Sequence, residues 1–300
     1  MRSGQRALVV EARPPDSPDL VPLIEAARRL GDAVDAIQLT DMPFATPHVA
    51  NLAAGTALRH AGHEVVLNVS CRDRNSIAQQ GTLLGAAALG IQNVFCIRGD
   101  EPRFGDHPHA RGVFEMSGLE LIALARALRD DAAYASGRQL SVAPALFIGA
   151  ALAPHAPYGD GAQALASRKV AAGADFLVTQ PLFDRHTLPR FLAEAGSTLD
   201  QCFVLAGLGA ATKLETLNAL AASDELYVPA EFTEQLRAAP SNARRLQLGI
   251  DHVLMIAEQA LASGASGVLV YPFDCGVEET LALCEALRPL LGSEGPSETA

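Results

Sequence analysis

Tryptophan is absent from this 300-residue chain, and aromatic residues make up only 5% of it. Flat side chains on which a ring-shaped ligand could stack are therefore few. No apolar run is long enough to span a bilayer, and the first residues are not followed by the hydrophobic region of a signal peptide. We therefore expect a soluble, cytoplasmic protein that does not act at a membrane.

The five cysteines are odd in number and show neither a CxxC pair nor a Cys/His spacing typical of metal sites. We expect reduced thiols and no bound metal. A GxGxxG turn after a strand and a GxxxxGK[ST] loop, which bind phosphates in many proteins, are also missing. The net charge of −11 argues against nucleic acid as a partner, and any anionic ligand must meet a local basic group.

Apolar strand-like runs alternate with helical segments along the chain, and 49% hydrophobic content is enough for a large core. The predicted strands are residues 7–10, 34–39, 65–70, 94–97, 141–148, 176–179, 203–206 and 267–270. Such alternation is typical of a parallel sheet with right-handed crossovers. Eight units in this length favour a single-domain α/β fold, a closed (β/α)8 TIM barrel over residues 1–291. Residues 292–300 are polar, and we expect a disordered tail.

Charged or amide side chains stand where most of these strands end. They are Glu11, Thr40, Asn68, Arg98 with Asp100, Gln180 and Asp274. In a barrel such residues meet at one mouth, where ligands bind. The structural alternative is that polar residues mark the exit of a strand from the core. That alternative explains any one of them, but an amide and two acids at different strand ends have no common structural need.

The stretch 65–101 contains strand, helix and strand, and each strand ends in a polar cluster, CRDRN at 71–75 and RGD at 98–100. Further motifs follow in order along the rest of the chain. They are EARPP (11–15), GDHP (105–108), GVFE (112–115), GAA (149–151), KVAAGADF (169–176) and TQP (179–181). This ordered set resembles the methylenetetrahydrofolate reductase family over nearly the whole chain. The resemblance implies an oxidoreductase of one-carbon metabolism and methionine biosynthesis. It would reduce 5,10-methylenetetrahydrofolate to 5-methyltetrahydrofolate with NADH or NADPH.

Glu11 follows four apolar residues, so dry surroundings are expected to raise its pKa, as a general acid at neutral pH requires. The resemblance implies that this glutamate helps open the methylene bridge of the folate to an electrophilic iminium. The structural alternative is a carboxylate that caps a helix or forms a salt bridge.

Asp100 is the second catalytic candidate, and the resemblance places it between the redox ring and the pterin of the substrate. Its alternative role is a salt bridge to Arg98 or Arg72. Gly99 permits close backbone approach to a flat ligand. Gln180 carries two donors and an acceptor, which suits the amide edge of a pterin. The structural alternative is a hydrogen bond from Gln180 to a neighbouring loop.

The resemblance also implies a set of cofactor contacts at the strand ends and on one helix. These are Thr40, Asn68, Arg98, Gly99, Asp100, Ala151, His155 and Lys169. Thr40 matches a position near the reacting nitrogen and is a candidate substrate contact as well. Lys169 matches a residue that contacts the phosphate or ribose of the cofactor, although alone it would be interpreted as a solvated lysine.

Several positions that hold FAD in the family differ here. Asn68 stands where a histidine is usual, and the run AALAPH at 150–155 replaces polar groups that bind the ribose and diphosphate. On the next helix Ala162 and Leu165 occupy aligned positions. Near the last strand, Asp274 and Cys275 replace a polar or basic pair that could meet the folate tail in the family. Each lost hydrogen bond removes about 1 to 3 kcal/mol, so flavin binding weakens by orders of magnitude.

Two mechanisms remain open at this point. Bound FAD relays the hydride, which the retained RGD at 98–100 and Lys169 favour, or a nicotinamide delivers it directly. A different class of function is a non-catalytic folate-binding or partner subunit that kept the barrel and lost its cofactor contacts. A third is an enzyme acting on another one-carbon carrier or pterin. A homo-oligomer is compatible with the sequence.

Overall fold

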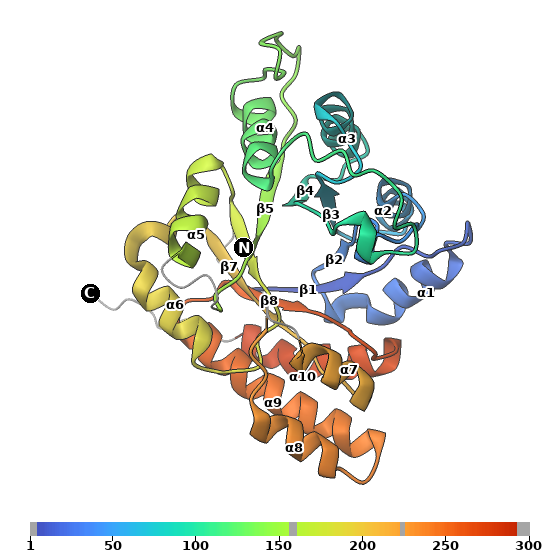
Figure 1. The fold of residues 1–300 in the computed structure, drawn as a ribbon, viewed down its shortest axis with the longest axis vertical. Helices are drawn as coiled ribbons and strands as arrows, with labels where there is room; N and C mark the ends of the chain where they lie inside the picture. The colour runs from blue at the N-terminus through green and yellow to red at the C-terminus, as the bar shows by residue number, and fades with distance from the viewer. Residues whose placement is uncertain (1–4, 156–160, 223–225, 293–300) are drawn as a thin grey trace.

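The structure, a computed structural model, describes residues 5–155, 161–222 and 226–292, and its core is a closed parallel barrel (Figure 1). The strands are β1 (Ala7–Ala12), β2 (Ala36–Leu39), β3 (Val65–Ser70), β4 (Asn93–Ile97), β5 (Phe147–Leu152), β6 (Phe176–Thr179), β7 (Phe203–Leu208) and β8 (Gly267–Val270). Each strand pairs with its neighbours in sequence, and β8 closes the ring on β1. The (β/α)8 prediction is confirmed.

Helices surround the barrel and cover its outer face (Figure 1). They are α1 (Val21–Leu30), α2 (Asn51–His60), α3 (Ser76–Ala88), α4 (Gly118–Asp130), α5 (Gly161–Ala172), α6 (Thr187–Ala195), α7 (Leu214–Ala221), α8 (Ala230–Ala238), α9 (Asn242–Ala262) and α10 (Val277–Leu291). Capping residues fix two helix starts beside the barrel mouth. Asn75 accepts a hydrogen bond from the Ala78 backbone, and Ser117 and Glu120 form a capping box at α4. Among the described helices, no segment has the length and apolarity that a bilayer crossing requires.

The alternation of side chains along each strand explains where the polar residues lie. Successive side chains of a strand point to opposite faces, so residues two apart share the barrel interior. Inside, an apolar layer contains Val9, Ala36, Val66, Phe95, Phe176, Val178, Leu205 and Leu269. Two residues after Val9, Val66 and Leu269 come the next inward positions. They are Glu11 on β1, Asn68 on β3 and Tyr271 directly after β8. The polar groups therefore sit directly above a packed apolar layer.

Several predicted strand boundaries differ from the structure: β1 and β7 end two residues later than predicted, β2 begins two residues later, and β5 differs most. Strand β5 begins at Phe147, not at residue 141, because Pro144 lacks a backbone donor and Val142 is 78% exposed. It ends at Leu152, so Ala150 and Ala151 belong to the strand. Residues 293–300 of the predicted tail lie outside the described ranges.

Candidate active site

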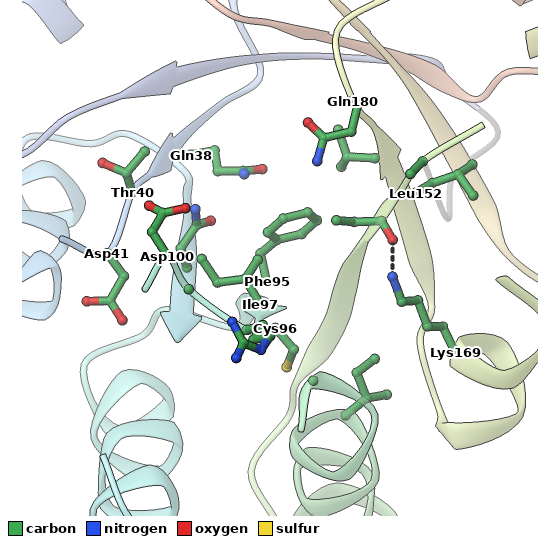
Figure 2. A pocket seen from close by; sticks show the side chains of 18 of the residues that line it. Gln38, Thr40, Asp41, Phe95, Cys96, Ile97, Asp100, Leu152, Lys169 and Gln180 are labelled. Carbon is green, nitrogen blue, oxygen red and sulfur yellow. Dashed lines mark hydrogen bonds between the residues drawn. The ribbon is translucent and has the colours of Figure 1, made fainter. Parts of the chain in front are cut away.

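A cavity of about 700 Å³ opens at the carboxyl ends of the strands. It brings together nearly all of the predicted site residues, namely Glu11, Thr40, Asn68, Arg98, Gly99, Asp100, Ala151, Lys169 and Gln180. Figure 2 shows Thr40 and Asp100 on one side of the cavity and Gln180, Leu152 and Lys169 on the other. Segments from the front of the chain to beyond its middle therefore meet around one space.

Two of the predicted polar residues do not line this cavity. His155 is buried and hydrogen-bonds the backbone of Pro181, and burial lowers its pKa despite that bond. Asp274 accepts hydrogen bonds from the backbone of Thr212 and Lys213, each at 2.8 Å, and so joins the loops after β7 and β8. In the structure Asp274 is a loop contact.

Glu11 lies at the floor of the cavity between β2 and β8. Its register partner on β2 is Gln38, and Tyr271 stands on the β8 side. Burial raises the pKa of Glu11 to about 7, against the opposing effect of the nearby Arg13 guanidinium. Glu11 makes no salt bridge with any described residue. A carboxyl group with this pKa can hold and release a proton at neutral pH.

Tyr271 is a neighbour of Glu11 that the sequence analysis did not select. Burial and the Glu11 charge raise the pKa of the phenol, which stays neutral. Its hydroxyl donates a hydrogen bond of 3.0 Å to the Thr179 carbonyl oxygen at the end of β6. The ring therefore forms a fixed apolar wall beside the acid.

Three buried oxygen atoms face this cavity without a partner among the described residues. They are Gln38 Oε1 on β2, Thr40 Oγ1 just beyond β2 and Asn68 Oδ1 on β3. Leaving a buried polar atom unpaired costs about 1–3 kcal/mol, so such atoms call for an explanation. A ligand that presents N–H groups would satisfy them. Gln38 was missed, although its place two residues before Thr40 was a sequence signal, because residues two apart share one face.

Asp100 follows β4, and the two arginines considered as its partners are paired elsewhere. Arg98 donates a hydrogen bond to Glu101 at 2.6 Å and lies 4.3 Å from the Phe114 ring centroid. Arg72 pairs with Asp73. Asp100 lines the cavity, and no described residue forms a salt bridge with it.

Gly99 is required for this loop to turn into the cavity. Its φ is +83°, in the left-handed region, and a Cβ there would lie 3.1 Å from the Cβ atoms of Ser70 and Arg72.

The side chains that hold the rim of the cavity are buried. Arg72 is 2% exposed and donates to the Met42 carbonyl oxygen at 3.0 Å, and Asp41 accepts from Arg74 at 2.6 Å and from the Ser70 backbone at 2.9 Å.

The wall formed by β5, α4 and α5 is apolar. Its lining consists of Leu119, Ile122, Leu152, Ala153, Ala162, Leu165 and Ala166. The cation on this wall is Lys169, whose Nζ donates a hydrogen bond of 2.6 Å to the Ala151 carbonyl oxygen (Figure 2). Burial lowers the pKa of Lys169. No group of three or more His, Cys, Asp or Glu side chains within the described ranges could hold a metal ion.

Solved structures with the same fold cover nearly all of the chain. An uncharacterized protein from Clostridium thermocellum, which binds two copies of 5-methyl-5,6,7,8-tetrahydrofolic acid, has a TM-score of 0.64 and 10% identity over 95% of this chain and 96% of its own. An F420-dependent secondary alcohol dehydrogenase, solved with an F420-acetone adduct, has a TM-score of 0.61 and 13% identity, covering 96% of this chain and 100% of its own. At these identities the likeness concerns the fold.

The family is shown by the sequence itself. A family model described as methylenetetrahydrofolate reductase matches residues 1–286. That range includes every strand of the barrel and every residue that lines the cavity. The chain therefore belongs to the methylenetetrahydrofolate reductase family.

Proposed function

We propose that this protein reduces 5,10-methylenetetrahydrofolate to 5-methyltetrahydrofolate with a hydride from NADH or NADPH. The observation that carries the proposal is the placement of Glu11, a carboxyl group with a pKa of about 7, in one cavity with Asp100 and Gln180. The proposed reaction needs a proton donor, a carboxylate and an amide, and the family membership supports this choice.

In the proposed reaction Glu11 donates its proton to the nitrogen that leaves the methylene bridge. The carbon–nitrogen bond breaks, its electron pair stays on that nitrogen, and the remaining nitrogen and carbon form an iminium cation. The Asp100 carboxylate stabilises this positive charge, which develops only after the bridge opens. The added hydride turns the methylene carbon into a methyl group. No side chain can supply the hydride, so a nicotinamide or flavin must.

The unpaired oxygens of Gln38, Thr40 and Asn68 suit the remaining recognition. They can accept hydrogen bonds from the N–H groups of a reduced pterin or of a nicotinamide amide. Gln180 across the cavity offers both donors and an acceptor to the other edge of the ring. Two flat reactants are thereby held beside Glu11, which is the positioning that hydride transfer requires.

The described residues do not fit the ribose and diphosphate of FAD. The wall on which they would lie is made of alanine, leucine and isoleucine side chains, and Lys169 already donates to the Ala151 carbonyl oxygen. A diphosphate there would lose its hydrogen bonds to water without gaining others. We therefore propose direct hydride transfer from the nicotinamide.

The purified protein is expected to be colourless and active with NADH or NADPH. The measurements are the visible absorption spectrum, a test for released flavin after denaturation, and the rate with and without added FAD. We expect no flavin bands and no stimulation by FAD. A yellow preparation holding about one flavin per chain would contradict direct transfer, whereas the reduction reaction itself would stand.

Gln180→Ala is expected to raise the KM for the folate about 3- to 10-fold and to leave kcat nearly unchanged. Loss of one neutral hydrogen bond costs about 0.5–1.5 kcal/mol, and this bond would form in ground state and transition state alike. Steady-state kinetics at saturating NADH measure it. Gln247→Ala is the matched control, because Gln247 lies exposed on α9, lines neither cavity and donates a hydrogen bond to Asp251. An unchanged KM would place the amide outside the folate site.

The second candidate function is a folate-binding subunit without turnover, which the apolar wall favours. An assay with NADH and 5,10-methylenetetrahydrofolate, with and without FAD, separates the two functions. Binding of folate with no turnover in either condition would support the binding subunit.

A further inference from the structure

A second cavity of about 630 Å³ adjoins the first on the side of α1, α7 and β8. Five residues line both cavities, namely Glu11, Arg13, Phe44, Gln180 and Tyr271. The rest of the second lining is largely apolar and includes Leu23, Ala26, Leu226, Phe273 and Val277. A reactant with a ring in the first cavity and an arm in the second must pass over these five residues.

The five shared residues form the junction of the two cavities, and Arg13 is the cation among them. It follows β1 two residues after Glu11, so both side chains belong to the same side of the chain. Its guanidinium is exposed and lies 4.9 Å from the centroid of the Phe44 ring. The other cations lining the first cavity, Arg98 and Lys169, are engaged with Glu101 and the Ala151 carbonyl. Within the described ranges no carboxylate hydrogen-bonds Arg13 or forms a salt bridge with it.

The backbone that carries the Phe44 ring is held by neighbouring segments, while the side chain itself is 60% exposed. Met42, Phe44 and Ala45 have φ values of +46°, +55° and +54°, a conformation that costs about 1–3 kcal/mol per residue. Gly105 packs so closely against this loop that a Cβ there would clash with the Ala45 carbonyl oxygen. Arg72 donates a hydrogen bond to the Met42 carbonyl oxygen at 3.0 Å. These contacts position Phe44 beside Arg13 at the junction.

We propose that Arg13, stacked on Phe44 between the two cavities, binds an oxyanion on the arm of one reactant. The inference rests on the proposed function, because both reactants then carry such groups, the folate as carboxylates and the dinucleotide as phosphates. A guanidinium on an aromatic face keeps its planar fork of donors, which matches carboxylate and phosphate oxygens alike. In a chain with a net charge of −11, an anionic arm needs a cation of this kind.

Anion binding at Arg13 also affects the acid. Arg13 lowers the proton affinity of Glu11, and a bound oxyanion offsets that charge, so the pKa of Glu11 rises and the complex takes up protons near neutral pH. Tyr271, which directly follows β8, lines both cavities with Glu11 and is a neutral phenol. Other titratable or charged groups that line the two cavities are Asp41, Cys96, Arg98, Asp100, Lys169 and Cys275. Arg13 is the group whose charge opposes the protonation of Glu11.

The test is calorimetric titration with NADH and, separately, with 5-methyltetrahydrofolate, in buffers of different ionisation enthalpy. Arg13→Gln is expected to raise the Kd of one probe about 10-fold or more and to abolish its proton uptake. Arg13→Lys should give an intermediate Kd, because an ammonium keeps the positive charge but lacks the planar pair of donors of a guanidinium. Arg103→Gln is the matched control, since Arg103 lies over Phe104 at 4.8 Å outside the cavity, and both Kd values should stay within about twofold.

The probe affected identifies the oxyanion. An effect on NADH indicates a phosphate, and an effect on the folate that disappears with tetrahydropteroate, which lacks the glutamate, indicates a carboxylate. If Arg13→Gln binds both probes within twofold of the wild type, the inference on Arg13 is wrong and the proposed function stands. If the wild type binds neither probe, the proposed function is rejected and this inference with it.

Discussion

Glu11→Gln is expected to lower kcat for the reduction of 5,10-methylenetetrahydrofolate about 10²-fold or more, with the Kd of each reactant within about threefold of the wild type. Glutamine has the size and polarity of the protonated acid, so binding survives, but it cannot transfer a proton to the leaving nitrogen. The hydride acceptor forms only after that transfer. Loss of the proton therefore limits every turnover.

The pH profile gives an independent measurement on the wild type. The pKa of Glu11 is raised to about 7, and the proposed reaction needs the protonated form. The value of kcat/KM, which reports the free enzyme, should therefore be highest below pH 7 and fall about tenfold per pH unit well above it. In Glu11→Gln this decrease above pH 7 should disappear. Glu25→Gln on α1 is the control, because that side chain is exposed and lines neither cavity. Wild-type turnover in Glu11→Gln would remove this residue from the mechanism.

Asp41→Asn is expected to lower the free energy of unfolding by about 3–5 kcal/mol. The Asp41 side chain is fully buried and that of Arg74 is 20% exposed, and they form a salt bridge of 2.6 Å. Burial disfavours the Arg74 charge, but the hydrogen bond and charge of Asp41 outweigh it and raise the pKa of the guanidinium. Without the carboxylate this largely buried cation remains unpaired, which is far more costly than loss of a surface pair.

Urea denaturation measures this effect against a surface pair in the same molecule. Arg29 and Glu278 form a salt bridge of 2.7 Å with side chains that are 61% and 67% exposed. Glu278→Gln should therefore change the unfolding free energy by less than about 1 kcal/mol. The double variant Asp41→Asn, Arg74→Met should recover part of the loss, because it removes the unpaired charge. A loss below 1 kcal/mol for Asp41→Asn would mean that water reaches Arg74 at the rim.

The inward-facing polar residues could be predicted because strand periodicity is a local property. Glu11 and Asn68 lie near the carboxyl ends of β1 and β3, and Gln180 directly follows β6. The closed barrel brings these positions together at one mouth. The alternation of strands and helices likewise predicted the fold. Gln38 obeys the same rule, as Asn68 does inside β3, but it was overlooked between its apolar neighbours Ile37 and Leu39.

Contacts between distant loops could not be predicted in this way. The left-handed conformations of Met42 and Phe44 depend on Gly105 and Arg72, which lie far along the chain. Their own residue types give no sign of a turn that glycine or asparagine would usually provide. The role of Arg13 depends on that loop. The boundary of β5 was misplaced because the apolar run before it passes through Pro144 and exposed residues.

The apolar layer beneath Glu11 limits how reactants can enter and leave the site. Phe95, Phe176, Leu205 and Leu269 fill the barrel below the acid, with Phe95 and Phe176 6.0 Å apart between ring centroids. The floor of the site is therefore closed, and reactants can enter and leave only on the mouth side of the barrel. In the proposed reaction each product must therefore leave before the next reactant can bind in the same place.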